Sequence, residues 1–147
     1  MFIEPLQYPK DWPRVVKRHF LLGLPFVGAQ EPVYRDICAQ LRARTDEYWN
    51  TWGDFGARQA LARFVAHSLA TAAQWPVPIF IPPDPFVLMA WDHRAVSVDD
   101  LSVQFALDEI AEHIGVKRNV IAWDRFEHST FGEVVDNLLQ LKPERGA

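Results

Sequence analysis

The sequence predicts a mainly helical protein, or an α+β protein with a minor strand pair, in which about five helices pack around an extended segment. Three observations lead to this expectation. Apolar residues recur at helical spacing in several stretches, which indicates amphipathic helices. Capping residues and glycines mark the ends of these stretches. Between residues 75 and 91 the pattern changes, because five of the eleven prolines lie between Pro76 and Pro85.

Residues 75–91, called the proline segment from here on, combine stiffness with large apolar side chains. Each proline fixes φ and removes a backbone donor, so the stretch up to Pro85 is neither a helix nor a central strand. Its apolar residues need burial, and they are Trp75, Val77, Ile79, Phe80, Ile81 and Phe86. We therefore expect the proline segment to cross the core in an extended conformation. The stretch 86–91 is too short for periodicity to separate a strand from one turn of helix.

Size and composition favour one domain spanning residues 1–147. A hydrophobic content of 49% is sufficient for a core. No run of roughly eighteen apolar residues occurs, so we expect no membrane span, and the N-terminus lacks the basic and apolar regions of a signal peptide. The single cysteine, Cys38, excludes an internal disulfide and a cysteine-based zinc site. These features favour a cytoplasmic protein.

The N-terminal half predicts three helices. The first follows Asp11 as N-cap and ends at Gly23, and the second opens at residues 30–32. The apolar stripe of the second helix comprises Val33 or Tyr34, Ile37, Cys38 and Leu41. The third runs from Phe55 to about Gln74 after Asp54 as its cap, and its many alanines favour close packing.

The C-terminal half predicts two more helices. Ser97 with Asp100 resembles a capping box, and the helix that follows ends at Gly115. Its buried face comprises Val103, Leu107, Ile110 and Ile114, widened by Phe105 and Ala106. A short strand is an option at 120–122. Thr130 with Glu133 forms a second capping box. The predicted buried face of the last helix comprises Phe131, Val134, Val135, Leu138 and Leu139.

The sequence predicts no catalytic residue, cofactor or metal site. Among the histidines only His113 has an acidic residue, Glu109, four positions away on a helix, and a metal site needs more converging ligands. We expect these two residues to form an exposed pair. Cys38 lies on an apolar stripe, which predicts an inert, buried thiol. The chain contains neither a Gly-rich phosphate loop nor a Gly-x-Ser-x-Gly elbow.

Three features of the C-terminal part occur together: Asp99-Asp100-Leu101, the run Ile-Ala-Glu-His-Ile-Gly-Val at 110–116, and Thr130 opening a final helix. This arrangement resembles the second half of an acyl carrier protein. In that family the serine of an Asp-Ser-Leu motif bears phosphopantetheine, and Asp100 stands in its place here. The resemblance covers about 40 residues. It implies a degenerate carrier-like protein that lacks the carrier serine.

Charge is distributed unevenly along the chain. Residues 1–75 carry nine Lys and Arg against seven Asp and Glu, whereas residues 76–147 carry six against twelve. Between Asp84 and Glu112 there are seven acids and one base, Arg94. Such a block repels nucleic acid and attracts basic partners. The candidate partner-binding residues are Trp91, Asp92, Asp99, Asp100, Asp108 and Glu112.

The functional hypothesis that follows is a non-catalytic protein-binding module. Small size, acidic charge and the lack of a catalytic motif are typical of a neutralising partner such as a bacterial immunity protein. Its partner would be a protein with a basic surface, and neither nucleic acid nor a membrane is expected to bind. The alternative is a small cytosolic hydrolase or transferase that uses His93 or His128 with Asp92 or Asp124.

Overall fold

The computed structural model describes residues 4–9, 30–54, 56–91 and 102–141. These residues form a mainly helical structure, as predicted, and they contain no strand beyond an isolated bridge between Pro85 and Thr130. The elements are α2 (Gln30–Arg42), the 3-10 helix η1 (Asp46–Trp52), α3 (Ala57–Ala73), α4 (Phe86–Ala90), α5 (Ser102–Ile114), the 3-10 turns η2 (Arg118–Val120) and η3 (Trp123–Phe126), and α6 (Phe131–Leu139). The expected first helix and the capping pair Ser97 and Asp100 lie outside the described residues.

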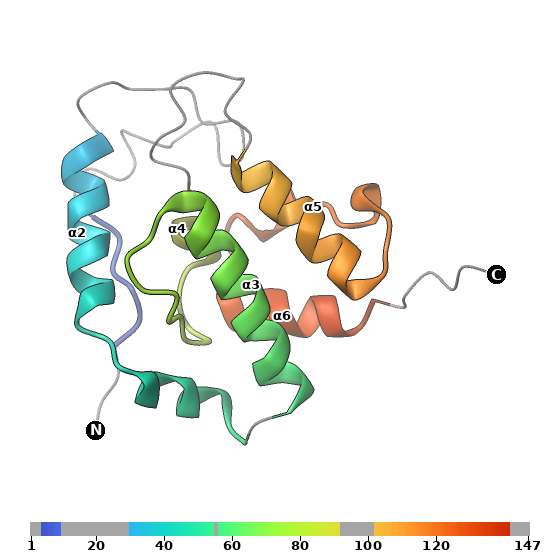
Figure 1. Cartoon of the computed structure of the whole chain (residues 1–147), viewed down its shortest axis with the longest axis horizontal. Helices are drawn as coiled ribbons and strands as arrows, with labels where there is room; N and C mark the ends of the chain where they lie inside the picture. Colours follow the sequence, from blue (N-terminus) through green and yellow to red (C-terminus); the bar gives the residue numbers. More distant parts are fainter. Residues whose placement is uncertain (1–3, 10–29, 55, 92–101, 142–147) are drawn as a thin grey trace.

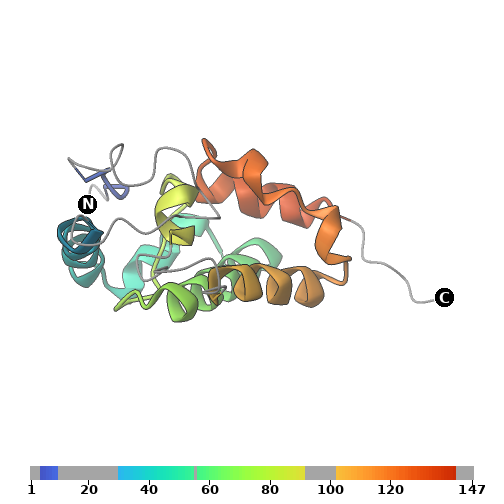
Figure 2. The ribbon, with the colours of Figure 1, turned by 90° about the horizontal axis from the view of Figure 1, so that it is seen from above.

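The helices are arranged in two layers around α3. In Figure 1, α3 runs through the middle of the molecule, with α2 on one side and α5 on the other. Figure 2 shows α3 and α5 side by side in one layer, α6 in the second, and α4 toward the same side as α6. The buried side of α3 carries Leu61, Ala62, Val65, Ala66, Leu69, Ala70 and Ala73. The small alanine side chains allow neighbouring helices to approach α3 closely.

The ends of two helices show which capping signals the structure uses. At α6 the predicted capping box is present: the Thr130 hydroxyl accepts the Glu133 N–H at 3.2 Å, and the Glu133 carboxylate accepts the Thr130 N–H at 3.0 Å. For α3 the expected cap was wrong, because Gly56 rather than Asp54 occupies the N-cap position. Gln74 closes α3 in a left-handed conformation with φ of 58°. The predicted end of this helix is therefore correct.

The proline segment contains no regular structure from Trp75 to Asp84. Phe80 is fully buried, and its ring meets the edge of Phe131 with centroids 6.3 Å apart. Two tryptophan side chains hold the backbone in place, since the Trp52 indole N–H donates to the Phe80 carbonyl and the Trp75 indole N–H donates to the Met89 carbonyl, each at 2.9 Å. After Pro85 the chain turns into α4, so of the two alternatives for this stretch the structure shows the helix.

A buried ion pair joins the proline segment to the residues after α2. Arg44 donates two hydrogen bonds to the Asp84 carboxylate, at 2.6 and 2.8 Å, and the two side chains are 3% and 0% exposed. The same carboxylate accepts the backbone N–H groups of Leu6 and Ile81, both at 2.8 Å. Arg44 also donates to the Ile79 carbonyl at 3.0 Å. Both charges are therefore satisfied away from water, which buried charges require.

Residues 4–9 lie against the helical part through this ion pair and through α2. Leu6 is buried in the core. The side-chain amide of Gln40 accepts the Gln7 N–H at 2.7 Å and donates to the Gln7 carbonyl at 3.0 Å, so it pairs with the backbone as a neighbouring strand would. Burial raises the pKa of Tyr8, and the charge of Glu127 raises it further. The N-terminal residues are therefore part of the packed structure.

Two apolar residues expected inside are exposed, and the short strand considered at 120–122 does not form. Phe105 is 65% exposed and Leu139 is 43% exposed. Phe105 precedes the buried Ile110 by five residues, which places it about 140° around the helix from the core direction. Val120 is the last residue of η2, and residues 121–122 connect η2 to η3, so residues 120–122 form no strand. In the part of the chain that the structure describes, no helix has both the length and the hydropathy to cross a bilayer.

Candidate partner-binding face

The structure places the predicted partner-binding residues in three different situations. Trp91 is 3% exposed, and its ring lies 6.4 Å from that of Trp75, so it belongs to the core. Asp92, Asp99 and Asp100 lie outside the described residues. Asp108 and Glu112 lie one turn apart on α5, as their spacing predicts. Only these last two can be placed on a described surface.

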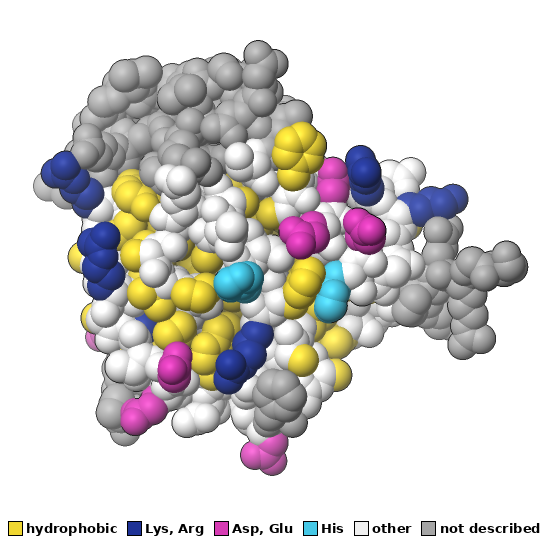
Figure 3. All heavy atoms as spheres, viewed as in Figure 1, with side chains coloured by type: hydrophobic (Ala, Val, Ile, Leu, Met, Phe, Trp, Pro, Cys, Tyr) yellow, Lys and Arg dark blue, Asp and Glu magenta, His cyan; other side chains and the backbone are white. Residues whose placement is uncertain are grey.

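The acidic side of α5 is larger than the two predicted residues. Glu109 and Glu112 are exposed, whereas the side chain of Asp108 is 21% exposed. Asp108 already has neighbours, because its carboxylate lies 3.7 Å from the Arg118 guanidinium and accepts a long bond of 3.5 Å from the Gln104 amide. Glu109 and Glu112 are therefore the more accessible charges. Figure 3 shows acidic side chains gathered over α5 on this face.

A row of exposed residues runs along α5 and meets α3 at its last member, His113. Phe105, Glu109 and His113 follow each other at intervals of four, so they form one stripe along the helix. The imidazole of His113 stacks on the ring of Phe64 from α3, with centroids 3.7 Å apart and planes at 10°. Glu109 and His113 are both exposed, as expected, but the contact that the structure shows for His113 is this stack, which sequence spacing does not reveal. The stacked rings form a ridge between α3 and α5.

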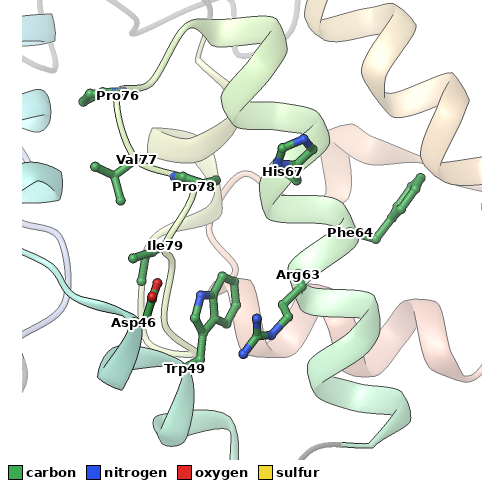
Figure 4. Close-up of a pocket in the computed structure, with 9 residues that line it drawn as sticks. All are labelled: Asp46, Trp49, Arg63, Phe64, His67, Pro76, Val77, Pro78 and Ile79. Atoms are coloured by element: carbon green, nitrogen blue, oxygen red, sulfur yellow. The ribbon is translucent and has the colours of Figure 1, made fainter.

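A groove of about 600 Å³ lies next to this ridge, on the side of α3 that faces η1 and the proline segment. Its residues come from η1, α3 and the proline segment, and they are Asp46, Trp49, Arg63, Phe64, His67, Pro76, Val77, Pro78 and Ile79. Figure 4 shows Arg63 and His67 on the α3 side, with the residues of the proline segment opposite. Sequence reasoning missed this groove. The only signal is that Arg63 and His67 lie four positions apart on the wet side of an alanine-rich helix.

A second groove, of about 520 Å³, lies between α3 and the ends of α5 and α6. It is almost entirely apolar and is lined by Ala57, Ala60, Leu61, Phe64, His113, Ile114, Leu138, Leu139 and Leu141. The exposed Leu139 belongs to this lining. Phe64 is shared by both grooves, so the stacked pair of Phe64 and His113 stands between two hollows on one face.

Of the residues considered for catalysis, the three that the structure describes, Cys38, Asp124 and His128, do not line either groove. Cys38 is buried and free, as its position on an apolar stripe predicts. Asp124 and His128 are exposed, in and just after η3, while Asp92 and His93 lie outside the described residues. Among residues 4–9, 30–54, 56–91 and 102–141, no three His, Cys, Asp or Glu side chains lie together as metal ligands would.

Comparisons with known proteins add no relative. No protein-family model matches the chain. Searches of curated proteins and of solved structures likewise find no match. Functional inference therefore rests on the geometry of the face formed by α3, α5 and the two grooves.

Proposed function

We propose that this chain is a non-catalytic protein-binding module that binds a basic protein through the exposed side of α5, as small acidic immunity proteins bind their targets. The observation that carries this proposal is the position of Phe105. Its ring is 65% exposed and lies one helical turn from the exposed Glu109. A large aromatic group beside accessible carboxylates is the composition that favours a protein interface, where aromatic anchors supply affinity and charges select the partner.

The neighbouring residues support the same use of this face. Glu112 adds a second accessible carboxylate on α5. Fixed on a helix that packs along α3, these groups need little reordering when a partner arrives, and preorganisation of this kind favours affinity. The charge of the C-terminal half, with six basic and twelve acidic residues, attracts the same class of partner from a distance.

The proposal is tested by capture with matched variants. The chain is immobilised as wild type, as Glu109→Lys with Glu112→Lys, and as Glu47→Lys with Asp54→Lys, and each is exposed to lysate of the source cells. The two double variants change net charge equally, but only the first alters α5. A basic protein retained by the wild type and by the Glu47/Asp54 control, and lost from the α5 variant, would support the proposal. Equal retention by all three, or no specific retention, would refute it.

A further inference from the structure

We propose that the groove between η1, α3 and the proline segment binds a small organic anion that has an apolar body, such as an aryl-substituted carboxylic acid. This inference is independent of the protein partner proposed for α5. It rests on the residues of the groove, which place the Arg63 guanidinium and the His67 imidazole on one wall and apolar side chains on the floor and the opposite wall. Its volume of about 600 Å³ lies within the range of small-molecule sites.

The apolar part of the site is built by Trp49 and the proline segment. Trp49 and Ile79 are each 6% exposed, so they present only an edge to the groove, and the half-buried Val77 and Pro78 continue this surface. Prolines on both sides of Val77 fix their own φ angles, which stiffens this wall. A ligand with an apolar body loses water contact here without requiring the wall to rearrange.

The cationic part is the wall formed by α3. The Arg63 guanidinium lies 4.9 Å above the Trp49 ring centre, and its Nε donates to the Gln59 side chain at 3.1 Å. Gln59 in turn donates to the Trp49 carbonyl at 3.2 Å. These contacts hold a permanently charged donor at the edge of the apolar floor. His67, one turn further along α3, adds a second donor on the same wall (Figure 4).

The sign of the ligand charge follows from the positions of these groups. Asp46 lies at the η1 end of the groove, whereas Arg63 and His67 both project from α3. Phe64 lines the groove at its α5 side, and its ring extends from α3 away from Arg63 and His67. A carboxylate at the α3 wall gains a charge-assisted hydrogen bond from Arg63, while its apolar body lies against Val77 and Pro78, beside the exposed edge of Trp49. An ammonium group in the same position is repelled by the positive charge of Arg63.

The test compares 4-phenylbutyrate with 4-phenylbutylamine, which have the same apolar body and opposite charges. Binding to the full chain is measured by calorimetry and by amide shifts in heteronuclear NMR. We expect phenylbutyrate to bind with a Kd on the order of 1 mM, as its size allows, and to shift the amides of Arg63, His67, Val77 and Ile79. The amine should bind at least roughly tenfold more weakly.

Three variants locate the site. Arg63→Gln removes the charge and should weaken phenylbutyrate roughly tenfold. Val77→Asp places a carboxylate in the apolar wall and should abolish binding, while Arg42→Gln removes an exposed charge from α2 and should leave the Kd unchanged. Circular dichroism verifies that each variant is folded. The proposal is overturned if phenylbutyrate does not bind, if the amine binds as tightly, if Arg63→Gln has the Kd of the wild type, or if the amide shifts lie elsewhere.

Discussion

Arg44 and Asp84 face each other in the protein interior and form a two-pronged ion pair, with Nη1 to Oδ2 at 2.6 Å and Nη2 to Oδ1 at 2.8 Å. The carboxylate also accepts two backbone N–H groups, one from the N-terminal residues and one from the proline segment. One pair of side chains therefore fixes the relative positions of three segments that are distant in the sequence. Such a pair specifies one arrangement of these segments, whatever its net contribution to stability.

Removing either member of this pair should destabilise the protein strongly. Arg44→Met leaves the Asp84 carboxylate buried without its counter-charge, so we expect the free energy of unfolding to fall by ~3–5 kcal/mol. The double variant Arg44→Met with Asp84→Leu should cost less than the sum of the two single variants, because it leaves no unpaired charge. Urea denaturation of the three variants measures this difference. A cost below ~1 kcal/mol for Arg44→Met would contradict the role assigned to the pair.

The burial of Phe80 leads to a second prediction about stability. Phe80→Ala removes a fully buried ring that contacts Phe131, and such deletions in packed cores cost ~3–5 kcal/mol. Phe105→Ala is the matched control, since the same ring is deleted at an exposed position and should change stability by less than ~0.5 kcal/mol. The two variants are compared by denaturant unfolding. Similar costs would show that the proline segment does not contribute to the core as described.

Gly132 should not tolerate a methyl group. An added Cβ would lie 3.0 Å from the Pro82 side chain and 3.2 Å from the Pro82 carbonyl, to which the Gly132 N–H donates at 2.8 Å. Although alanine favours helices by ~1 kcal/mol over glycine, we expect Gly132→Ala to destabilise by ~1–3 kcal/mol because rigid atoms must move. At Gly56 the nearest such atom is 4.0 Å away. Thermal unfolding should therefore show a larger loss for Gly132→Ala than for Gly56→Ala, which meets no rigid atom and loses only the preference for glycine at the N-cap of α3.

The charges of α5 should act mainly on the rate of association with the proposed partner. Glu109→Lys with Glu112→Lys should slow association steeply at low salt, while dissociation changes less, because exposed charges steer encounter more than they stabilise the complex. Stability should change by at most ~1 kcal/mol. The measurement is the association rate at two ionic strengths, with Glu47→Lys and Asp54→Lys as the control of equal charge. If the two double variants associate at equal rates and with equal salt dependence, the acidic residues of α5 are only solvated surface and do not steer the partner.

Sequence periodicity was sufficient for α2, α3, α5 and α6, but not for the short helix α4 or for the segments between the helices. The stripe on α2 and the capping box of α6 depend on residues a few positions apart, and local patterns contain that information. Phe105 and Leu139 are exposed because no neighbouring element that the structure describes covers that flank of their helices. The apolar periodicity of one helix does not contain information about its neighbours. The 3-10 helix after α2 was missed because its tryptophans are buried by distant residues rather than by a local repeat.

The candidate site was less predictable than the fold. Helical spacing correctly placed Asp108 and Glu112 together on one helix, but the candidate binding residues left out the exposed Glu109 and included Trp91, which is buried. The stack of His113 on Phe64 joins residues from two helices, and the Arg63 groove joins three segments. The ion pair of Arg44 and Asp84 spans 40 positions. No pattern within a short window contains such pairings, because they arise only when the elements pack.

The large sequence separation between the Asp84 carboxylate and its partners has a consequence for synthesis of the protein on the ribosome. One of its partners, Leu6, precedes it by 78 residues, and Gly132 binds the backbone of Pro82 from beyond α5. Until the α6 region has left the exit tunnel, the proline segment of the nascent chain lacks Phe131 and its surrounding contacts. The N-terminal half thus emerges with core tryptophans and no complete enclosure for them, so the core closes only after the residues of α6 have left the exit tunnel.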